Sequence, residues 1–179
     1  MRLPGVLLAA LLLIPALSGC ASTPTPAGGE PSSPATSATL PTFQATDING
    51  ELFDFGEHLG TKAVLMSFWA MWCEPCKAEM PFLQALHQKY ADKGLLVLSV
   101  SMDGPDTQGS VAPYIYSNGY EFTCVMDEDS AITQAYNPKA VAPFSVFIDA
   151  EGRHVRNVEG FQLSEAAAIE AEVVHLLGL

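Results

Sequence analysis

The stretch that most restricts the fold is an apolar run that ends shortly before a pair of cysteines. Residues 63–70 read AVLMSFWA and are apolar at every position except Ser67. A run of this length predicts a β-strand that is buried on both of its faces. Cys73 and Cys76 follow it, and the apolar spacing after them predicts a helix over residues 74–90. The cysteines are therefore expected where a buried strand gives way to a helix, a common place for sites in open α/β sheets.

The remaining elements are expected from the same kinds of pattern. Short alternating runs on either side of Asn49-Gly50 predict an N-terminal β-hairpin. Ser164 is expected to cap the last helix, with Glu165 favourably placed near its positive end. Further strands are predicted over residues 95–101, 122–126, 144–149 and 154–160, and further helices over 111–117, 130–136 and 164–177. Together these elements predict an α/β domain with a mixed central β-sheet flanked by helices.

The N-terminal segment is read as a targeting sequence followed by a tether. Residues 6–17 are apolar, but a run of about twelve residues is too short to span a bilayer. Small residues and a cysteine follow, and LSGC resembles a bacterial lipobox, which implies a signal peptide over residues 1–19 and lipid on Cys20. An ordinary signal peptide with an incidental cysteine is the alternative. Residues 20–40 are rich in Pro, Ser and Thr and predict a disordered tether, which leaves residues 41–179 as one domain.

Charge and the pattern of metal-ligand residues exclude two classes of function. The chain carries 8 Lys and Arg against 20 Asp and Glu, a formal net charge of −12, so nucleic acid is not an expected partner. A zinc site usually needs four ligands, and neither a second CxxC nor a pair of closely spaced histidines is present. The sequence therefore predicts no metal site.

The spacing of the cysteines favours redox chemistry over a structural role. A disulfide between Cys73 and Cys76 closes so short a loop that it constrains the unfolded chain little. The N-terminus of a helix carries a partial positive charge, which stabilises a thiolate on the first cysteine. Cys76, one turn further on, can then attack Cys73 and resolve a mixed disulfide. Pro75 suits the first helical turn, while Lys77 and Glu74 are expected to act on the thiolate in opposite directions.

The residues around the cysteines resemble a known family. WCEPCK, placed between an apolar strand and a helix, resembles the active site of thioredoxin-like proteins. The longer motif FWAMWCEPCKAEMP is similar to the TlpA/ResA group of extracytoplasmic, membrane-tethered thiol-disulfide oxidoreductases. The resemblance extends over residues 41–178. It implies a thioredoxin-like fold with an N-terminal β-hairpin and a strand and helix inserted over residues 122–136.

The resemblance implies further site residues. Pro143 matches the family's cis-proline, which faces the cysteines and leaves the main chain of Ala142 free to pair with a substrate. Glu79 matches an acidic residue that can carry a proton to or from the buried thiol. The expected substrate contacts are Trp72, Glu74, Pro75, Ala142 and Pro143. Trp72 is expected to flank and shield the first cysteine, whereas Trp69 is expected to pack in the fold.

Two positions depart from the family pattern. Ser67 stands where thioredoxin has a buried Asp, so a proton-transfer role must fall elsewhere, which favours Glu79. Cys124 has no counterpart in the pattern. Its position in a strand favours a small buried side chain, and the alternative is a reactive or resolving thiol.

The predicted function is that of a lipid-anchored, extracytoplasmic protein-disulfide reductase that needs no organic cofactor. The resemblance implies a membrane electron donor of the DsbD or CcdA kind, and substrates such as apocytochrome c or other oxidised envelope proteins. One alternative is an oxidase that runs the same chemistry in reverse. Another is a peroxiredoxin-like thiol peroxidase, although Ala70 occupies the position where that class needs a Thr. A third is a non-catalytic binding lipoprotein.

Overall fold

The computed structural model describes residues 40–179 of the chain. The predictions that concern the signal peptide, lipid on Cys20 and almost all of the tether fall on residues 1–39 and so lie outside the described residues. Within residues 40–179, no helix is both long enough and apolar enough to cross a membrane.

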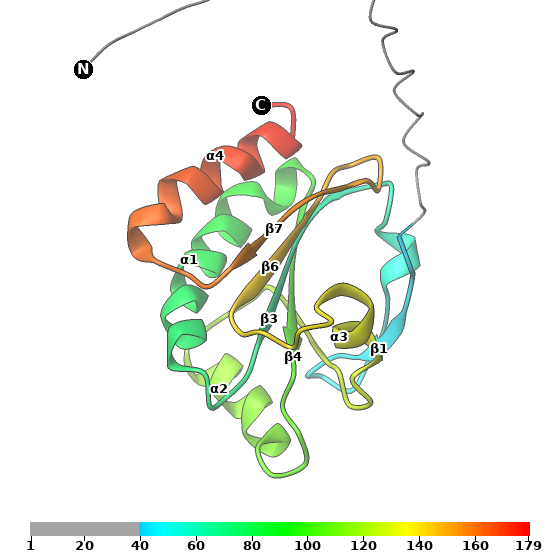
Figure 1. Ribbon diagram of the computed structural model, residues 1–179, viewed down its shortest axis with the longest axis vertical. Helices are drawn as coiled ribbons and strands as arrows, with labels where there is room; N and C mark the ends of the chain where they lie inside the picture. Colours follow the sequence, from blue (N-terminus) through cyan, green and yellow to red (C-terminus); the bar gives the residue numbers. More distant parts are fainter. Residues whose placement is uncertain (1–39) are drawn as a thin grey trace, which may run out of the picture. The chain divides into compact units, whose positions relative to one another are not determined.

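A five-stranded mixed sheet forms the centre of the domain (Figure 1). Its order is β5-β4-β3-β6-β7. The strands are β3 (Ala63–Trp69), β4 (Leu95–Ser101), β5 (Thr123–Met126), β6 (Phe144–Ile148) and β7 (His154–Glu159). β3, β4 and β5 are parallel, whereas β6 runs antiparallel to β3, and β7 antiparallel to β6. The predicted mixed sheet is therefore confirmed.

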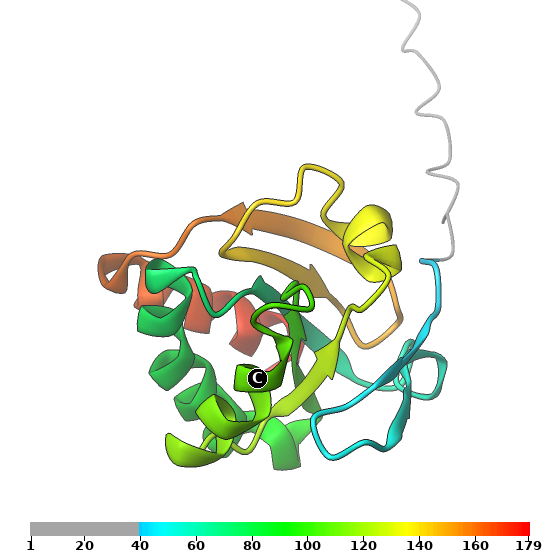
Figure 2. The same ribbon diagram turned by 90° about the horizontal axis from the view of Figure 1, so that it is seen from below.

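Helices and a hairpin cover the two faces of this sheet (Figure 2). One core lies between the sheet and the helices α1 (Glu74–Tyr90), α2 (Val111–Ser117) and α4 (Ala166–Leu176). The other lies beneath α3 (Ala131–Tyr136) and the N-terminal segment that carries β1 (Gln44–Thr46) and β2 (Leu52–Asp54). Every residue of β3 is buried because both of its faces are covered.

Most predicted boundaries agree with the structure, and one predicted cap is wrong. The bounds of α1, β4 and α2 coincide with the expected ranges, and β1 and β2 form the expected antiparallel hairpin. Ser164 does not cap the last helix. It lies inside a 3₁₀ turn, Leu163–Glu165, and Glu165 takes the N-cap position without a side-chain hydrogen bond. Such turns often precede α-helices, and their main-chain bonds occupy groups that a cap would otherwise serve.

Strand pairing brings three separate segments to the carboxyl end of β3. Phe68 pairs with Phe144, so Pro143, which precedes Phe144, lies next to the last residues of β3. Trp69 pairs with Ser101, so the chain that leaves β4 emerges at the same edge. The cysteines follow β3 directly. This edge of the sheet is therefore where the fold positions a site.

Candidate active site

Cys73 and Cys76 form a disulfide at the start of α1. Cys73 is the N-cap of this helix, and its Sγ accepts a hydrogen bond from the main-chain N–H of Cys76 at 3.2 Å. The same N–H can stabilise a Cys73 thiolate once the disulfide is reduced, because it points at the sulfur from the positive end of the helix. Pro75 lies in the first turn, where no N–H is needed.

The surface beside the disulfide combines an exposed aromatic ring with a neutralised pair of charges. Trp72 is 61% exposed, so most of its ring is open to a partner. Glu74 and Lys77 form an ion pair of 2.8 Å. Their opposite effects on the Cys73 sulfur therefore cancel in part, and a surface pair of this kind adds little to stability. Trp69, in contrast, is fully buried, as expected.

Pro143 directly precedes β6 and borders the site beside the end of β3. The Ala142–Pro143 peptide bond is cis, as the sequence resemblance implied. The carbonyl of Pro143 accepts a hydrogen bond from the Gly160 N–H at 2.8 Å, which continues the pairing of β6 with β7. Ala142 is partly buried and packs against the core cluster that contains both cysteines. Within residues 40–179 its main-chain N–H and C=O have no hydrogen-bond partner.

Glu79 is a buried carboxyl group on the face of α1 that carries Cys76. The two residues are one helical turn apart, and Glu79 is only 2% exposed. The Ser67 hydroxyl donates to one carboxyl oxygen at 3.0 Å, and the Ser145 hydroxyl donates to the other at 3.3 Å. Burial raises the pKa of Glu79 to about 7, although the two serine hydrogen bonds act in the opposite direction. A carboxyl with this pKa can both take up and release a proton near neutral pH.

Two further side chains shape the site, and no sequence pattern indicated them. Ser145 lies opposite Ser67 across the β3–β6 pair, so both serines reach the same carboxyl group. Asp103, 3% exposed, follows β4 and accepts the Met71 N–H with both oxygens, at 3.0 and 2.9 Å. The Ser101 and Thr107 hydroxyls also donate to Asp103, at 2.9 and 2.6 Å. Asp103 therefore fixes the loop that leads to Cys73, and nothing in its sequence surroundings marks this role.

Cys124 is a free and buried thiol in β5. Burial raises its pKa to about 12, although the Ser99 hydroxyl donates to its sulfur at 3.8 Å. A thiol reacts as its thiolate, and with a pKa this high very little thiolate is present at neutral pH. The structure therefore favours the interpretation of Cys124 as a small core side chain.

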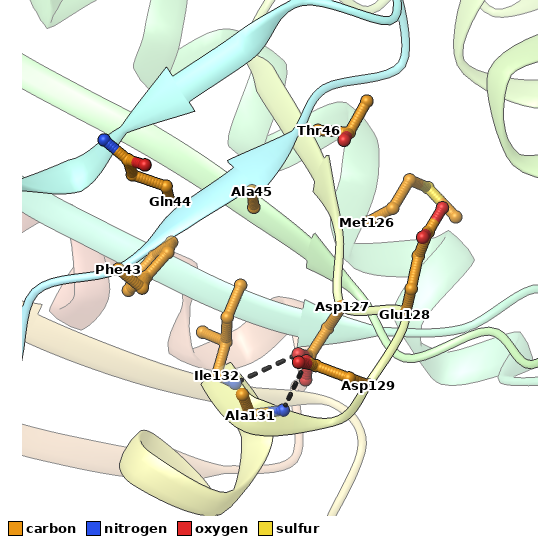
Figure 3. Close-up of a pocket in the computed structure, with 10 residues that line it drawn as sticks. All are labelled: Phe43, Gln44, Ala45, Thr46, Met126, Asp127, Glu128, Asp129, Ala131 and Ile132. Carbon is orange, nitrogen blue, oxygen red and sulfur yellow. Dashed lines mark hydrogen bonds between the residues drawn. The ribbon is translucent and has the colours of Figure 1, made fainter.

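Other acidic groups and cavities lie apart from the disulfide. Residues 40–179 contain no group of three or more His, Cys, Asp or Glu side chains that could hold a metal ion. A cavity of about 200 Å³ lies between β1 and the start of α3 (Figure 3), and its lining includes no cysteine. Two of its carboxylates bind the start of the adjoining helix, since Asp127 accepts the Ile132 N–H and Asp129 accepts the Ala131 N–H.

Comparison with known sequences agrees with this geometry. A model of the AhpC/TSA family matches residues 36–157. ResA, a thiol-disulfide oxidoreductase of Bacillus thuringiensis, is 30% identical over 125 residues, which cover 70% of each chain. The chain belongs to the ResA-like thiol-disulfide oxidoreductases, within the AhpC/TSA family. ResA of Oceanobacillus iheyensis is 33% identical over 123 residues, which cover 67% of this chain and 62% of that one.

Solved structures share the fold of this chain. A Chlorobium tepidum protein described as thiol:disulfide interchange protein DsbE superposes with a TM-score of 0.71 at 27% identity, over 78% of this chain and 96% of that one. The exposed lipoprotein thioredoxin Etrx1 of Streptococcus pneumoniae shares the fold, with a TM-score of 0.62 at 23% identity over 74% of this chain and 98% of that one. The thioredoxin-like fold is thereby confirmed, and the enzyme is a thiol-disulfide oxidoreductase.

The raised pKa of Glu79 predicts a pH-dependent loss of stability. An unfolded chain ionises this carboxyl near 4.5, whereas the folded protein keeps it protonated up to about 7. Rising pH across this window therefore favours unfolding. Relative to wild type, Glu79→Gln should gain about 3 kcal/mol in the free energy of unfolding as pH rises through the window. Urea unfolding of the oxidised protein at several pH values measures this, with the exposed Glu57→Gln as control. A constant difference between Glu79→Gln and wild type would contradict the prediction.

Removal of the Asp103 carboxylate should destabilise the site loop. Asp103→Ala leaves the Met71 N–H without its acceptor in a partly buried setting, and we expect a loss of about 2 kcal/mol in the free energy of unfolding. Asp106→Ala, an exposed position in the same loop, is the matched control. Urea unfolding gives the free energy, and amide hydrogen exchange should show faster exchange at Met71. Equal behaviour of the two variants would show that Asp103 does not hold the loop.

Proposed function

We propose that this protein is a reductase of protein disulfides. The observation that carries the proposal is the Cys73–Cys76 disulfide at a helix N-terminus, with the free main chain of Ala142 on one side and the buried acid Glu79 behind it. This arrangement supplies an attacking sulfur, an edge that an extended chain can pair with, and a group that exchanges protons. The ResA-like relatives support the type of chemistry.

The reaction begins from the reduced protein. The Cys73 thiolate attacks one sulfur of the substrate disulfide, and the other substrate sulfur leaves as a thiolate and takes up a proton. Cys76 then loses its proton and attacks Cys73. The second substrate sulfur leaves in the same way, and the Cys73–Cys76 disulfide forms. The substrate gains two electrons and two protons, and the protein loses two electrons, so an external dithiol must restore it.

Glu79 is the proposed acceptor of the Cys76 proton. Cys76 is fully buried, so water does not reach its thiol easily, and an internal base on the same face of α1 shortens the path of the proton. The pKa of about 7 allows the carboxylate form to be present at neutral pH and the protonated form to persist long enough to return the proton.

The contacts with substrate are proposed from the exposed groups around the disulfide. The unpaired main chain of Ala142 can form hydrogen bonds with an extended polypeptide, as an added strand does at a sheet edge. The exposed ring of Trp72 can cover an apolar side chain of the same partner. Glu74, Pro75 and Pro143 complete the proposed contact surface.

The place of the reaction is proposed from the N-terminal sequence and the family resemblance. Lipid on Cys20 would anchor the domain to a bacterial membrane on its extracytoplasmic side, with residues 20–40 as a tether. A membrane dithiol protein of the DsbD or CcdA kind would supply electrons. Oxidised envelope proteins, apocytochrome c before haem attachment among them, are the proposed substrates.

A thiol peroxidase is the second candidate, because the matching family model carries the AhpC/TSA name. The site argues against it in one respect. Ala70 offers no hydroxyl at the position that a peroxidase of this kind uses to orient peroxide, and its side chain is fully buried. An oxidase would use the same residues and differs from the proposed reductase only in its reduction potential.

The reduction potential of the Cys73–Cys76 couple is the decisive measurement. With Cys124→Ser to remove the free thiol of residues 40–179, we expect a value below about −220 mV, toward that of thioredoxin. Equilibration of the full chain with glutathione buffers, followed by alkylation, gives this value. A result near about −120 mV would identify a disulfide donor and contradict the reductase proposal.

Trapping and peroxide assays complete this test. Cys76→Ser should accumulate mixed disulfides between Cys73 and client proteins, whereas the Cys73→Ser, Cys76→Ser double variant should accumulate none. Rapid consumption of peroxide by the reduced protein, without reduction of a protein disulfide, would favour the peroxidase instead.

The lipid anchor is tested separately. Cys20→Ala should move the protein from the membrane fraction to the soluble fraction of a bacterial host, because several acyl chains hold a protein to a bilayer stably where one chain is marginal. Cys124→Ala is the control, since it removes a cysteine that has no role in anchoring. Immunoblots of the separated fractions measure the shift, and retention of Cys20→Ala in membranes would rule out this anchor.

A further inference from the structure

The main chain before Pro143 is held by one buried side chain. Asn137 follows α3 and is fully buried. Its Nδ2 donates to the carbonyl of Val141 at 2.7 Å, and its Oδ1 accepts the N–H of Val141 at 3.1 Å. A single amide therefore satisfies both main-chain groups of the residue directly before Ala142.

The turn that connects these residues is strained and tightly closed. The N–H of Ala140 donates to the carbonyl of Asn137 at 2.7 Å, and Ala140 has a φ of 50°. A residue with a Cβ adopts this left-handed conformation at a cost in free energy, because the Cβ approaches the following carbonyl oxygen. Such a conformation persists only where the surrounding contacts fix it, and here the Ala140 N–H bond to Asn137 and the two side-chain bonds from Asn137 to Val141 close the turn.

Asn137 also contacts the loop that borders the other side of the site. Its Nδ2 lies 3.8 Å from the Sδ of Met102, in the segment that follows β4. The Met102 N–H in turn donates to the Trp69 carbonyl at 2.8 Å, at the end of the strand that leads to the cysteines. One chain of contacts thus connects the loop before Pro143 to the segment that carries Cys73.

We infer that Asn137 is a positioning residue for polypeptide substrates. It fixes the main chain of Val141 and thereby holds the unpaired N–H and C=O groups of Ala142 in place. These groups can then form hydrogen bonds with the extended substrate segment that carries the disulfide. This inference rests on the proposed reduction of protein disulfides. No hydrogen bond joins Asn137 to either cysteine or to Glu79, so its effect falls on the docking of the substrate rather than on the sulfur chemistry. A small disulfide that has no peptide groups gains nothing from Ala142.

The test compares two disulfides of different size. The full chain, reduced beforehand, is mixed with insulin or with hydroxyethyl disulfide, and tryptophan fluorescence follows formation of the Cys73–Cys76 disulfide. In Asn137→Ala the rate with insulin should fall about tenfold more than the rate with hydroxyethyl disulfide, the loss expected for one or two hydrogen bonds. Asn118→Ala is the matched control, because Asn118 is exposed and also donates to a main-chain carbonyl, that of Tyr114.

A second variant and a second measurement keep the test decisive. Asn137→Asp retains the side-chain volume and the acceptor for the Val141 N–H, and should show a selective loss in the same direction if the alanine variant does not fold. Equal losses with both disulfides, or no loss with insulin, would overturn the inference.

Hydrogen exchange separates this inference from the proposed function. If wild type reduces hydroxyethyl disulfide but not insulin, the proposed substrate class fails and the substrate-positioning role fails with it. The Val141 amide should still exchange faster in Asn137→Ala than in wild type, which supports the structural part of the inference. Unchanged exchange at Val141 would overturn that part as well.

Discussion

The antiparallel pairing of β3 with β6 determines which parts of the chain meet at the disulfide. β3 ends just before Cys73, and β6 begins just after Pro143, so their register sets these two segments side by side although 70 residues of sequence separate them. A slip of β6 by one residue would turn Ser145 away from α1, because side chains alternate between the faces of a sheet. The same pairing therefore positions the proline and builds the pocket for Glu79.

The carboxyl group of Glu79 belongs to a helix but accepts its hydrogen bonds from the sheet. Thioredoxin carries its buried acid on the strand, at the position of Ser67, whereas here the carboxyl group comes from the facing helix and the strand supplies a hydroxyl donor. Burial of a carboxylate without a nearby cation raises its free energy. Hydrogen bonds from two neutral donors offset only part of that increase. The outcome is a pKa of about 7 rather than a permanently ionised acid, so the group is suited to moving a proton and poorly suited to adding stability.

The sequence was informative where a local pattern determines the structure. The apolar run of β3 and the spacing along α1 predicted both elements, and the cis bond at Pro143 followed from the family resemblance. Asp103 and Asn137 could not be found in this way. Asp103 binds Met71, 32 positions earlier in the chain, and this contact depends on how the β4 loop packs against the turn after β3. Asn137 acts over only four residues, but an Asn before a Pro reads simply as a turn signal.

The direction of the reaction depends on opposing electrostatic effects within one helical turn. The main-chain N–H of Cys76 and the helix N-terminus stabilise a Cys73 thiolate, which favours the dithiol form and makes the couple a better oxidant. An ionised Glu79 has the opposite effect, since a buried negative charge on the same helix face disfavours a second one on sulfur. Because the pKa of Glu79 lies near 7, the balance between these effects changes within the physiological range of pH. Rising pH strengthens the second effect, so the proton on Glu79 and the electrons on the cysteines form one coupled system rather than two independent sites.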